Sequence, residues 1–143
     1  MTMTIEPIKI LFGSDFHFGL STMDGEEMAA AFEAVIYPVL KDCDIFWVNG
    51  DYFETLISFN SSGFDPIYEA IMSLYRFCEQ HCIILRFLQG TFMHDRNQCQ
   101  RLRTFYRQGQ FTFDFAVVDQ IALEEISLSL IHISEPTRLA LIS

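Results

Sequence analysis

The sequence is poor in basic residues and lacks the C-x-x-C spacing that is typical of metal-binding or redox cysteines. Lysine and arginine together number 9 against 19 aspartates and glutamates, which gives a formal net charge of −10. A surface of this sign repels phosphate backbones, so charge alone argues against nucleic-acid binding, although bound divalent cations would reverse the sign locally. The 4 cysteines form no C-x-x-C pair, and we expect them to be reduced thiols of a cytoplasmic protein.

Long apolar runs, a secretory signal and internal repeats are also missing. The apolar stretch "CIILRFL" is short and is interrupted by Arg86, so it falls well below the length that spans a bilayer. The opening "MTMTIEPIK" is polar and does not resemble a secretory signal. We therefore expect no membrane partner. Of the 143 residues, 50% are hydrophobic and 15% aromatic, which is enough for one domain with a substantial core.

Apolar and amphipathic segments alternate along the chain. This alternation predicts an α/β fold, with a βαβαβ parallel sheet and flanking helices joined by right-handed crossovers. Pro38 should kink the first helix or end its regular part. The stretch 111–126 predicts a fourth strand and a short continuation. The expected strands are 8–14, 44–49 and 82–89, and the expected helices are 25–41, 66–80 and about 96–108.

Acidic residues follow each of the first three predicted strands, and histidine follows two of them. Because the carboxyl ends of parallel strands meet at one edge of the sheet, we expect these side chains to converge on one pocket. Glycine precedes each group, at positions 13, 50 and 90, where it permits a tight turn or a close backbone approach. The residues are Asp15 and His17, then Asp51 and Glu54, then His94 and Asp95.

These residue types suit a divalent-cation site. Asp15 and His17 are two residues apart, so on an extended segment both side chains point to the same side. Asp51 has two carboxylate oxygens and could bridge two ions. Mixed imidazole and carboxylate ligands favour manganese, iron or zinc over calcium. Two such ions, about 3.5–4 Å apart, would clamp a phosphoryl group and activate a water, and a nearby histidine could protonate the leaving oxygen.

Each motif also has an ordinary explanation when taken alone. The Asp15–His17 pair could be solvated at a strand end, and Gly50-Asp51 could be a simple turn. Asp95 could cap the helix that follows it. The ordered occurrence of all three motifs, each after a buried strand, favours a site. A non-catalytic α/β binding module remains the alternative.

Three stretches of the chain resemble motifs of a known enzyme family. The segments "SDFHFG", "VNGDYFE" and "LQGTFMHD" resemble the D-x-H, G-D-x-x-[DE] and G-N-H-[DE] motifs of calcineurin-like metallophosphoesterases. The third segment is closer to the SbcD-type DNA-repair nucleases, especially their phage-like members. The resemblance covers roughly residues 8–126.

The resemblance implies a fold and a set of roles. The predicted sheet would be the N-terminal half of a calcineurin-like αββα sandwich, in which a second sheet packs on the first. The cofactors would be two divalent metal ions, with manganese preferred and magnesium, iron or zinc as options. Asp15 and His17 would bind the first ion, Asp51 would bridge both, His94 would be the catalytic proton donor, and Glu54 and Asp95 would orient these groups.

The implied function is phosphodiester hydrolysis by a DNA exonuclease or endonuclease. DNA would be the substrate and an SbcC-like ATPase a partner, and a homodimer is left open. A phosphatase or a small-molecule phosphodiesterase fits the same motifs. The segment 96–107 is the one concentrated basic stretch, and Arg96, Arg101 and Arg103 would contact a phosphate backbone unless they form a solvated helix face.

The chain also departs from the family pattern. Met93 stands where the third motif supplies an asparagine ligand, and no later G-H-x-H motif occurs. Residues 128–143, "LSLIHISEPTRLALIS", look like translated sequencing-adapter DNA, with a genuine amphipathic terminus as the alternative. We therefore expect residues 1–127 to be the N-terminal part of a metallophosphoesterase domain, and the chain to have little or no activity by itself.

Overall fold

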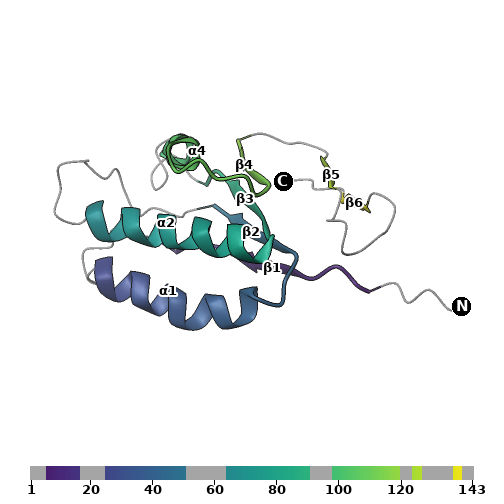
Figure 1. The fold of residues 1–143 in the computed structure, drawn as a ribbon, viewed down its shortest axis with the longest axis horizontal. Helices are drawn as coiled ribbons and strands as arrows, with labels where there is room; N and C mark the ends of the chain where they lie inside the picture. The colour runs from purple at the N-terminus through teal and green to yellow at the C-terminus, as the bar shows by residue number, and fades with distance from the viewer. Residues whose placement is uncertain are drawn as a thin grey trace, which may run out of the picture.

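Strands and helices alternate along the chain in a computed structural model (Figure 1). The structure describes residues 6–16, 25–50, 64–90, 98–119, 124–126 and 137–139. The helices of these ranges are α1 (Gly25–Leu40), α2 (Phe64–His81) and α4 (Cys99–Gln108). The strands that alternate with them are β1 (Ile10–Gly13), β2 (Ile45–Asn49), β3 (Ile84–Leu88) and β4 (Phe115–Val118).

These four strands form one parallel sheet in the order β1-β2-β3-β4. Ile10 pairs with Ile45, and Ile45 pairs with Ile84, so the first three strands are in register. The α/β class and the parallel sheet with flanking helices are thus confirmed. Each crossover moves the chain one strand further in the same direction. Right-handed crossovers of this kind place all the connecting helices on one face of the sheet.

The core lies between that face and the helices. Side chains alternate between the two faces of a strand, so Phe46, Val48, Leu85 and Phe87 point to the same side. All four are buried in one cluster with residues of α1, α2 and α4. Figure 1 shows α1 and α2 running alongside each other across the sheet. The helical members of the cluster include Phe32, Leu40, Ile71, Leu74, Tyr75, Leu102 and Phe105.

The opposite face of the sheet has a different character. Ile45 and Ile84 are buried there, with Ile8 and Ile10 packed against them, and this cluster contains no residue of a described helix. Arg86 shares this face by alternation and is also buried. Its guanidinium forms ion pairs with Asp114 and Glu124. Burial alone would lower the pKa of Arg86, but the hydrogen bonds to these two carboxylates raise it above its ordinary value.

Helix α1 continues past its proline. Pro38 lies inside α1, which extends to Leu40, so of the two expected effects of this proline, the helix does not end at it. Because Pro38 lies in the last turn, its missing N–H interrupts little of the helix beyond it. The next backbone N–H groups find partners in the same turn, since Lys41 N donates to the Tyr37 oxygen at 3.1 Å. Glu26 and Glu27 occupy the first turn, where carboxylates interact favourably with the helix dipole.

Helix α4 is fixed to the rest of the core by aromatic side chains. The hydroxyl of buried Tyr75 on α2 donates to the Leu102 carbonyl at 2.8 Å. The ring of Tyr106 stacks on that of Phe115 on β4, with the ring centroids 4.8 Å apart. These contacts tie α2, α4 and β4 together, and so fix the position of the fourth strand.

A second, smaller sheet follows β4. It consists of β5 (Glu124–Ile126) and β6 (Thr137–Leu139), which pair antiparallel. The sequence predicted only a short continuation here, and β6 lies within residues 128–143, the stretch that we expected to lie beyond the metallophosphoesterase-like part. Among the helices of the described ranges, none is long and apolar enough to cross a membrane.

Candidate functional site

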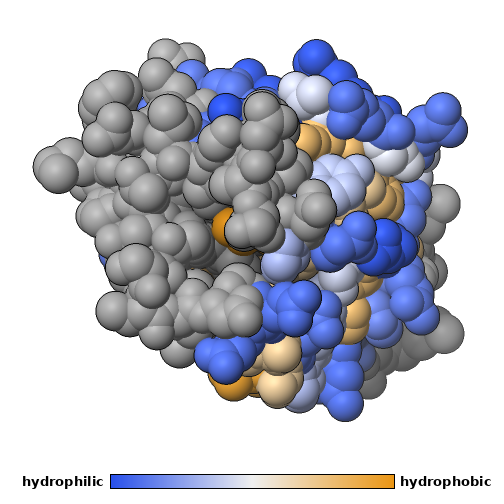
Figure 2. All heavy atoms as spheres, turned by 90° about the vertical axis from the view of Figure 1, so that its left-hand side faces the viewer, coloured by the Kyte–Doolittle hydropathy of each residue, from blue (hydrophilic) through white to orange (hydrophobic). Residues whose placement is uncertain are grey.

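The carboxyl ends of β1, β2 and β3 lie next to one another. The three strands are parallel and in register, and they end at Gly13, Asn49 and Leu88. Because helices α1 and α2 run back along the sheet, they begin at this same edge, which is at the left in Figure 1. Figure 2 looks onto this side of the molecule, where the coloured residues are mostly hydrophilic, with a few hydrophobic ones between them.

Asp15 is joined directly to the end of β2. Its backbone N–H donates a hydrogen bond to the carbonyl oxygen of Gly50, with 3.2 Å between nitrogen and oxygen. Asp15 also has a φ of 57°, in the left-handed region that aspartate enters more readily than most residues with a side chain. Such outliers are frequent at functional sites, where the surrounding structure holds them in place. The hydrogen bond to Gly50 is one contact that holds this conformation.

Gly50 is in turn packed against the end of β3. Its φ is 83°, which glycine adopts at no steric cost. A Cβ atom at position 50 would lie 2.8 Å from the Cα of Gly90 and 3.2 Å from its nitrogen. The two backbones therefore approach one another as closely as two glycines allow. The first residues beyond the three strands, near Asp15, Gly50 and Gly90, thus meet at one place.

Only part of the predicted site lies in the described ranges. Asp15 is exposed and belongs to them, whereas the other predicted site residues before α4 lie outside the described residues. Among the described residues, no three His, Cys, Asp or Glu side chains are grouped closely enough to hold a metal ion. The residues outside the described ranges are His17, Asp51, Glu54, His94, Asp95 and Arg96.

The two described arginines of the predicted phosphate contact lie on α4 and are half-buried. Arg103 donates hydrogen bonds to the carbonyl of Val117 and to Oε1 of Gln100, each at 2.8 Å. Its guanidinium therefore ties α4 to β4. A phosphate bound by Arg103 would have to share the guanidinium with these two partners.

Asp119 was not among the predicted site residues. This exposed residue follows β4 directly, at the same edge of the sheet as the other strand ends. The neighbouring strands are joined there, because Gln89 N donates to the Val118 oxygen at 2.9 Å. An acidic residue directly after an apolar strand was the signal used for the first three strands, and the same signal would have identified Asp119.

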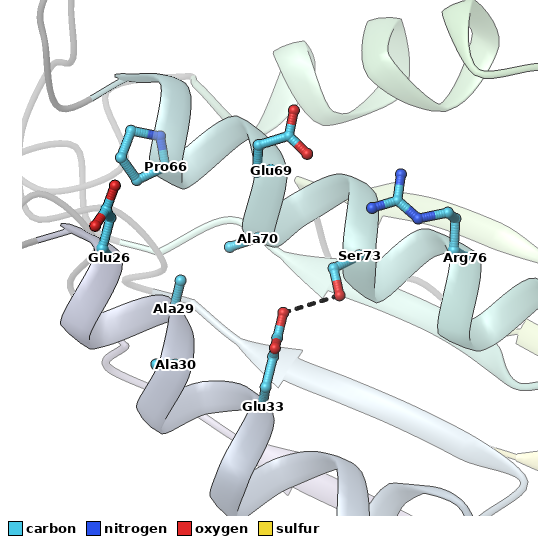
Figure 3. A pocket seen from close by; sticks show the side chains of 9 residues that line it. All are labelled: Glu26, Ala29, Ala30, Glu33, Pro66, Glu69, Ala70, Ser73 and Arg76. Carbon is cyan, nitrogen blue, oxygen red and sulfur yellow. Dashed lines mark hydrogen bonds between the residues drawn. The ribbon is translucent and has the colours of Figure 1, made fainter.

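A groove lies between α1 and α2 (Figure 3). It has a volume of about 640 Å³, and the predicted site residues within the described ranges, Asp15, Arg101 and Arg103, are not among the residues that line it. Ser73 donates to Glu33 at 3.0 Å and accepts a hydrogen bond from the Tyr37 hydroxyl at 3.0 Å. Burial raises the pKa of Tyr37 well above its ordinary value, so this hydroxyl stays protonated. The lining residues are Glu26, Ala29, Ala30, Glu33, Pro66, Glu69, Ala70, Ser73 and Arg76.

A comparison of the sequence with models of known protein families finds no match, and a comparison with curated proteins finds none either.

Proposed function

We propose that this chain carries a divalent-cation site of a phosphoesterase, and that the reaction it serves is hydrolysis of phosphodiester bonds, with DNA as the substrate. The observation that supports the proposal is the meeting of three strand ends. Asp15 is hydrogen-bonded to Gly50, and Gly50 is packed against Gly90. Motif residues follow each of these positions by at most a few residues in the sequence.

The donor set fits the cations that the motifs imply. Asp15 lies exposed at this edge of the sheet. In the proposal Asp15 and His17 hold one cation, and Asp51 contributes a carboxylate to it and to a second. Carboxylate and imidazole together suit manganese, with magnesium, iron and zinc as further options. When bound, such ions polarise a phosphoryl group and lower the pKa of a water molecule.

In this proposal the remaining motif residues either donate a proton or hold neighbouring side chains in place. His94 protonates the oxygen of the departing group, which requires an imidazole within hydrogen-bond distance of that oxygen. Glu54 and Asp95 accept hydrogen bonds that hold their neighbours in one orientation. Met93 has a thioether, which is a weak ligand for manganese. We therefore propose that this chain turns over slowly even when it binds one cation well.

The arrangement of helices supports the same proposal. The described helices pack on one face of the sheet, and the cluster on the other face holds no residue of a described helix. In the family that the motifs resemble, that second face packs against another sheet. We therefore include in this proposal that the sheet is one half of an αββα sandwich, and that an SbcC-like ATPase is a partner.

Calorimetric titration with Mn²⁺ tests the proposal. We expect the wild-type chain to bind Mn²⁺ and the Asp51→Asn variant to bind it much more weakly, because an amide lacks the charge and one of the two oxygen donors. Asp42→Asn is the matched control, since Asp42 lies exposed near the opposite end of β2. Equal binding by wild type and Asp51→Asn would contradict the proposal. Absence of binding by the wild-type chain would favour a non-catalytic module.

A further inference from the structure

Gly50 follows β2, and its backbone contacts the residues that follow the two strands beside β2, which are β1 and β3. On one side its carbonyl oxygen accepts the Asp15 N–H at 3.2 Å, which joins it to the end of β1. On the other side its Cα region meets the backbone of Gly90, at the end of β3. Gly50 is itself buried and follows β2 directly. It is thus the central member of a row of three strand ends.

A side chain at position 50 would disturb both contacts. A Cβ built there lies 2.8 Å from the Gly90 Cα, a distance that real Cβ atoms essentially never show. The obstacle is backbone, which cannot rotate away as the end of a flexible side chain can. In addition, φ at position 50 is 83°, which residues with a Cβ rarely adopt. The strand ends would have to separate, or Gly50 would have to change conformation and move its carbonyl away from Asp15.

We infer that Gly50 is the positioning residue of the candidate cation site: its backbone fixes Asp15 on one side and Gly90 on the other. The effect of Gly50 on cation affinity rests on the proposed function. Residues that orient metal ligands commonly change affinity about 10- to 100-fold when they are altered. Gly50 would act in this way through main-chain geometry, without contacting the ion.

The first readout does not depend on any metal. In the wild-type protein the Asp15 amide should exchange slowly with solvent, because it is hydrogen-bonded to Gly50. In Gly50→Ala we expect this amide to exchange at least about tenfold faster, while amides of the core strands keep their protection. Gly50→Asn is the second variant, because asparagine tolerates a positive φ better than alanine but still carries a Cβ that meets Gly90.

The second readout is the dissociation constant for Mn²⁺. We expect it to rise about 10- to 100-fold in Gly50→Ala and in Gly50→Asn. The matched control is Gly109→Ala, at the end of α4. A Cβ there would meet the ring of Phe111 at 2.4 Å, far along the chain from the strand ends, and φ is −78°. This variant should lose stability through packing and keep both wild-type Mn²⁺ affinity and slow exchange at Asp15.

The outcomes separate this inference from the proposed function. If the wild-type chain binds no Mn²⁺, the proposed function fails, and the exchange rate of the Asp15 amide alone decides the positioning role. The inference is overturned if the wild-type Asp15 amide exchanges as fast as that of an unstructured peptide. It is equally overturned if a folded Gly50 variant keeps both slow Asp15 exchange and wild-type Mn²⁺ affinity.

Discussion

The guanidinium of Arg86 lies 2.8 Å from the carboxylate of Asp114. The Arg86 side chain is only 3% exposed, whereas Asp114 is 53% exposed. Nε of Arg86 also donates to Glu124 at 2.9 Å. The positive charge is therefore buried on the strand face opposite the helices, and its two partners connect it to water. This cluster joins β3 both to the residue before β4 and to the smaller sheet.

Replacement of Arg86 by methionine should destabilise the protein. It would remove a buried cation, leave two carboxylates close together, and free the backbone carbonyl of Asp114, which Arg86 also contacts at 3.2 Å. Breaking a fully buried ion pair costs about 3–5 kcal/mol, but here the carboxylates reach solvent. We expect a loss of about 2–3 kcal/mol in the free energy of unfolding, measured by urea denaturation.

Arg107→Met is the control for this change. Arg107 is exposed in the last turn of α4, so its replacement removes the same charge without disturbing a buried cluster. We expect an effect within about 0.5 kcal/mol. Similar losses in the two variants would show that Arg86 stabilises the protein only through the net charge.

Glu79 should make the stability depend on pH. Its carboxylate accepts hydrogen bonds from the Thr112 hydroxyl and the Thr112 N–H, and from Phe113 N–H at 2.9 Å. These bonds lower the pKa of Glu79 below its ordinary value. A lowered pKa means that the unfolded state binds the proton more tightly, so the stabilisation is present above the unfolded pKa, about 4.3, and is lost as the pH falls through the folded value.

The comparison of wild type with Glu79→Gln tests this dependence. Wild type should be the more stable protein at pH 7, and the difference should narrow below about pH 4 in urea titrations. Glu69 is exposed on the same helix, so the Glu69→Gln variant reports the effect of the lost charge alone. A difference between wild type and Glu79→Gln that stays constant from neutral to acidic pH would contradict this account.

Because Asp15 has a left-handed conformation, replacing it by glycine should leave the protein more stable than replacing it by alanine, which is the reverse of the usual order. Asp15→Gly and Asp15→Ala both remove the carboxylate, but only alanine carries a Cβ at a φ of 57°. We expect the glycine variant to be more stable by about 1 kcal/mol in urea denaturation. At Asp42 in the turn after α1, whose φ is not positive, alanine should be at least as stable as glycine. An alanine variant at position 15 as stable as the glycine variant would show that the strain is absent.

The proposed function predicts that Met93→Asn strengthens the binding of a second cation. The substitution supplies the amide oxygen that the family's third motif carries at this position, and such oxygens bind manganese better than a thioether. We expect calorimetry to show a higher Mn²⁺ stoichiometry, and phosphodiester hydrolysis to rise with it. Met93→Leu is the control, because it keeps an apolar side chain without a donor. Identical stoichiometry in the two variants would exclude position 93 as a ligand position.

Much of the fold could be predicted because local patterns encode it. Apolar runs of strand length and amphipathic segments of helical length predicted β1, β2, β3 and the three helices to within a few residues, and they placed β4 within the longer stretch 111–126. The order of strands in the sheet could not be predicted in this way, since it depends on contacts between distant residues. The ion pairs of Arg86 were missed for the same reason, because Glu124 is 38 residues away along the chain.

The candidate site could be predicted only in its residue types and their placement at strand ends. The sequence pointed to Gly13, Gly50 and Gly90 as positions of a tight turn or a close backbone approach, and the backbones of Gly50 and Gly90 do meet. It gave no sign that Asp15 adopts a positive φ, because that conformation follows from the hydrogen bond to Gly50, a tertiary contact. Asp119 was missed because the fourth strand was predicted as part of a longer apolar stretch without a defined end.

The central claim is that the motif residues beyond β1 and β2 share one cation. The most direct test is anomalous diffraction from crystals of the protein grown with Mn²⁺. Our account predicts a manganese peak at coordination distance from the carboxylates of Asp15 and Asp51 and the imidazole of His17. Side chains of these three residues on different faces of the protein, or a manganese peak that none of them contacts, would contradict it.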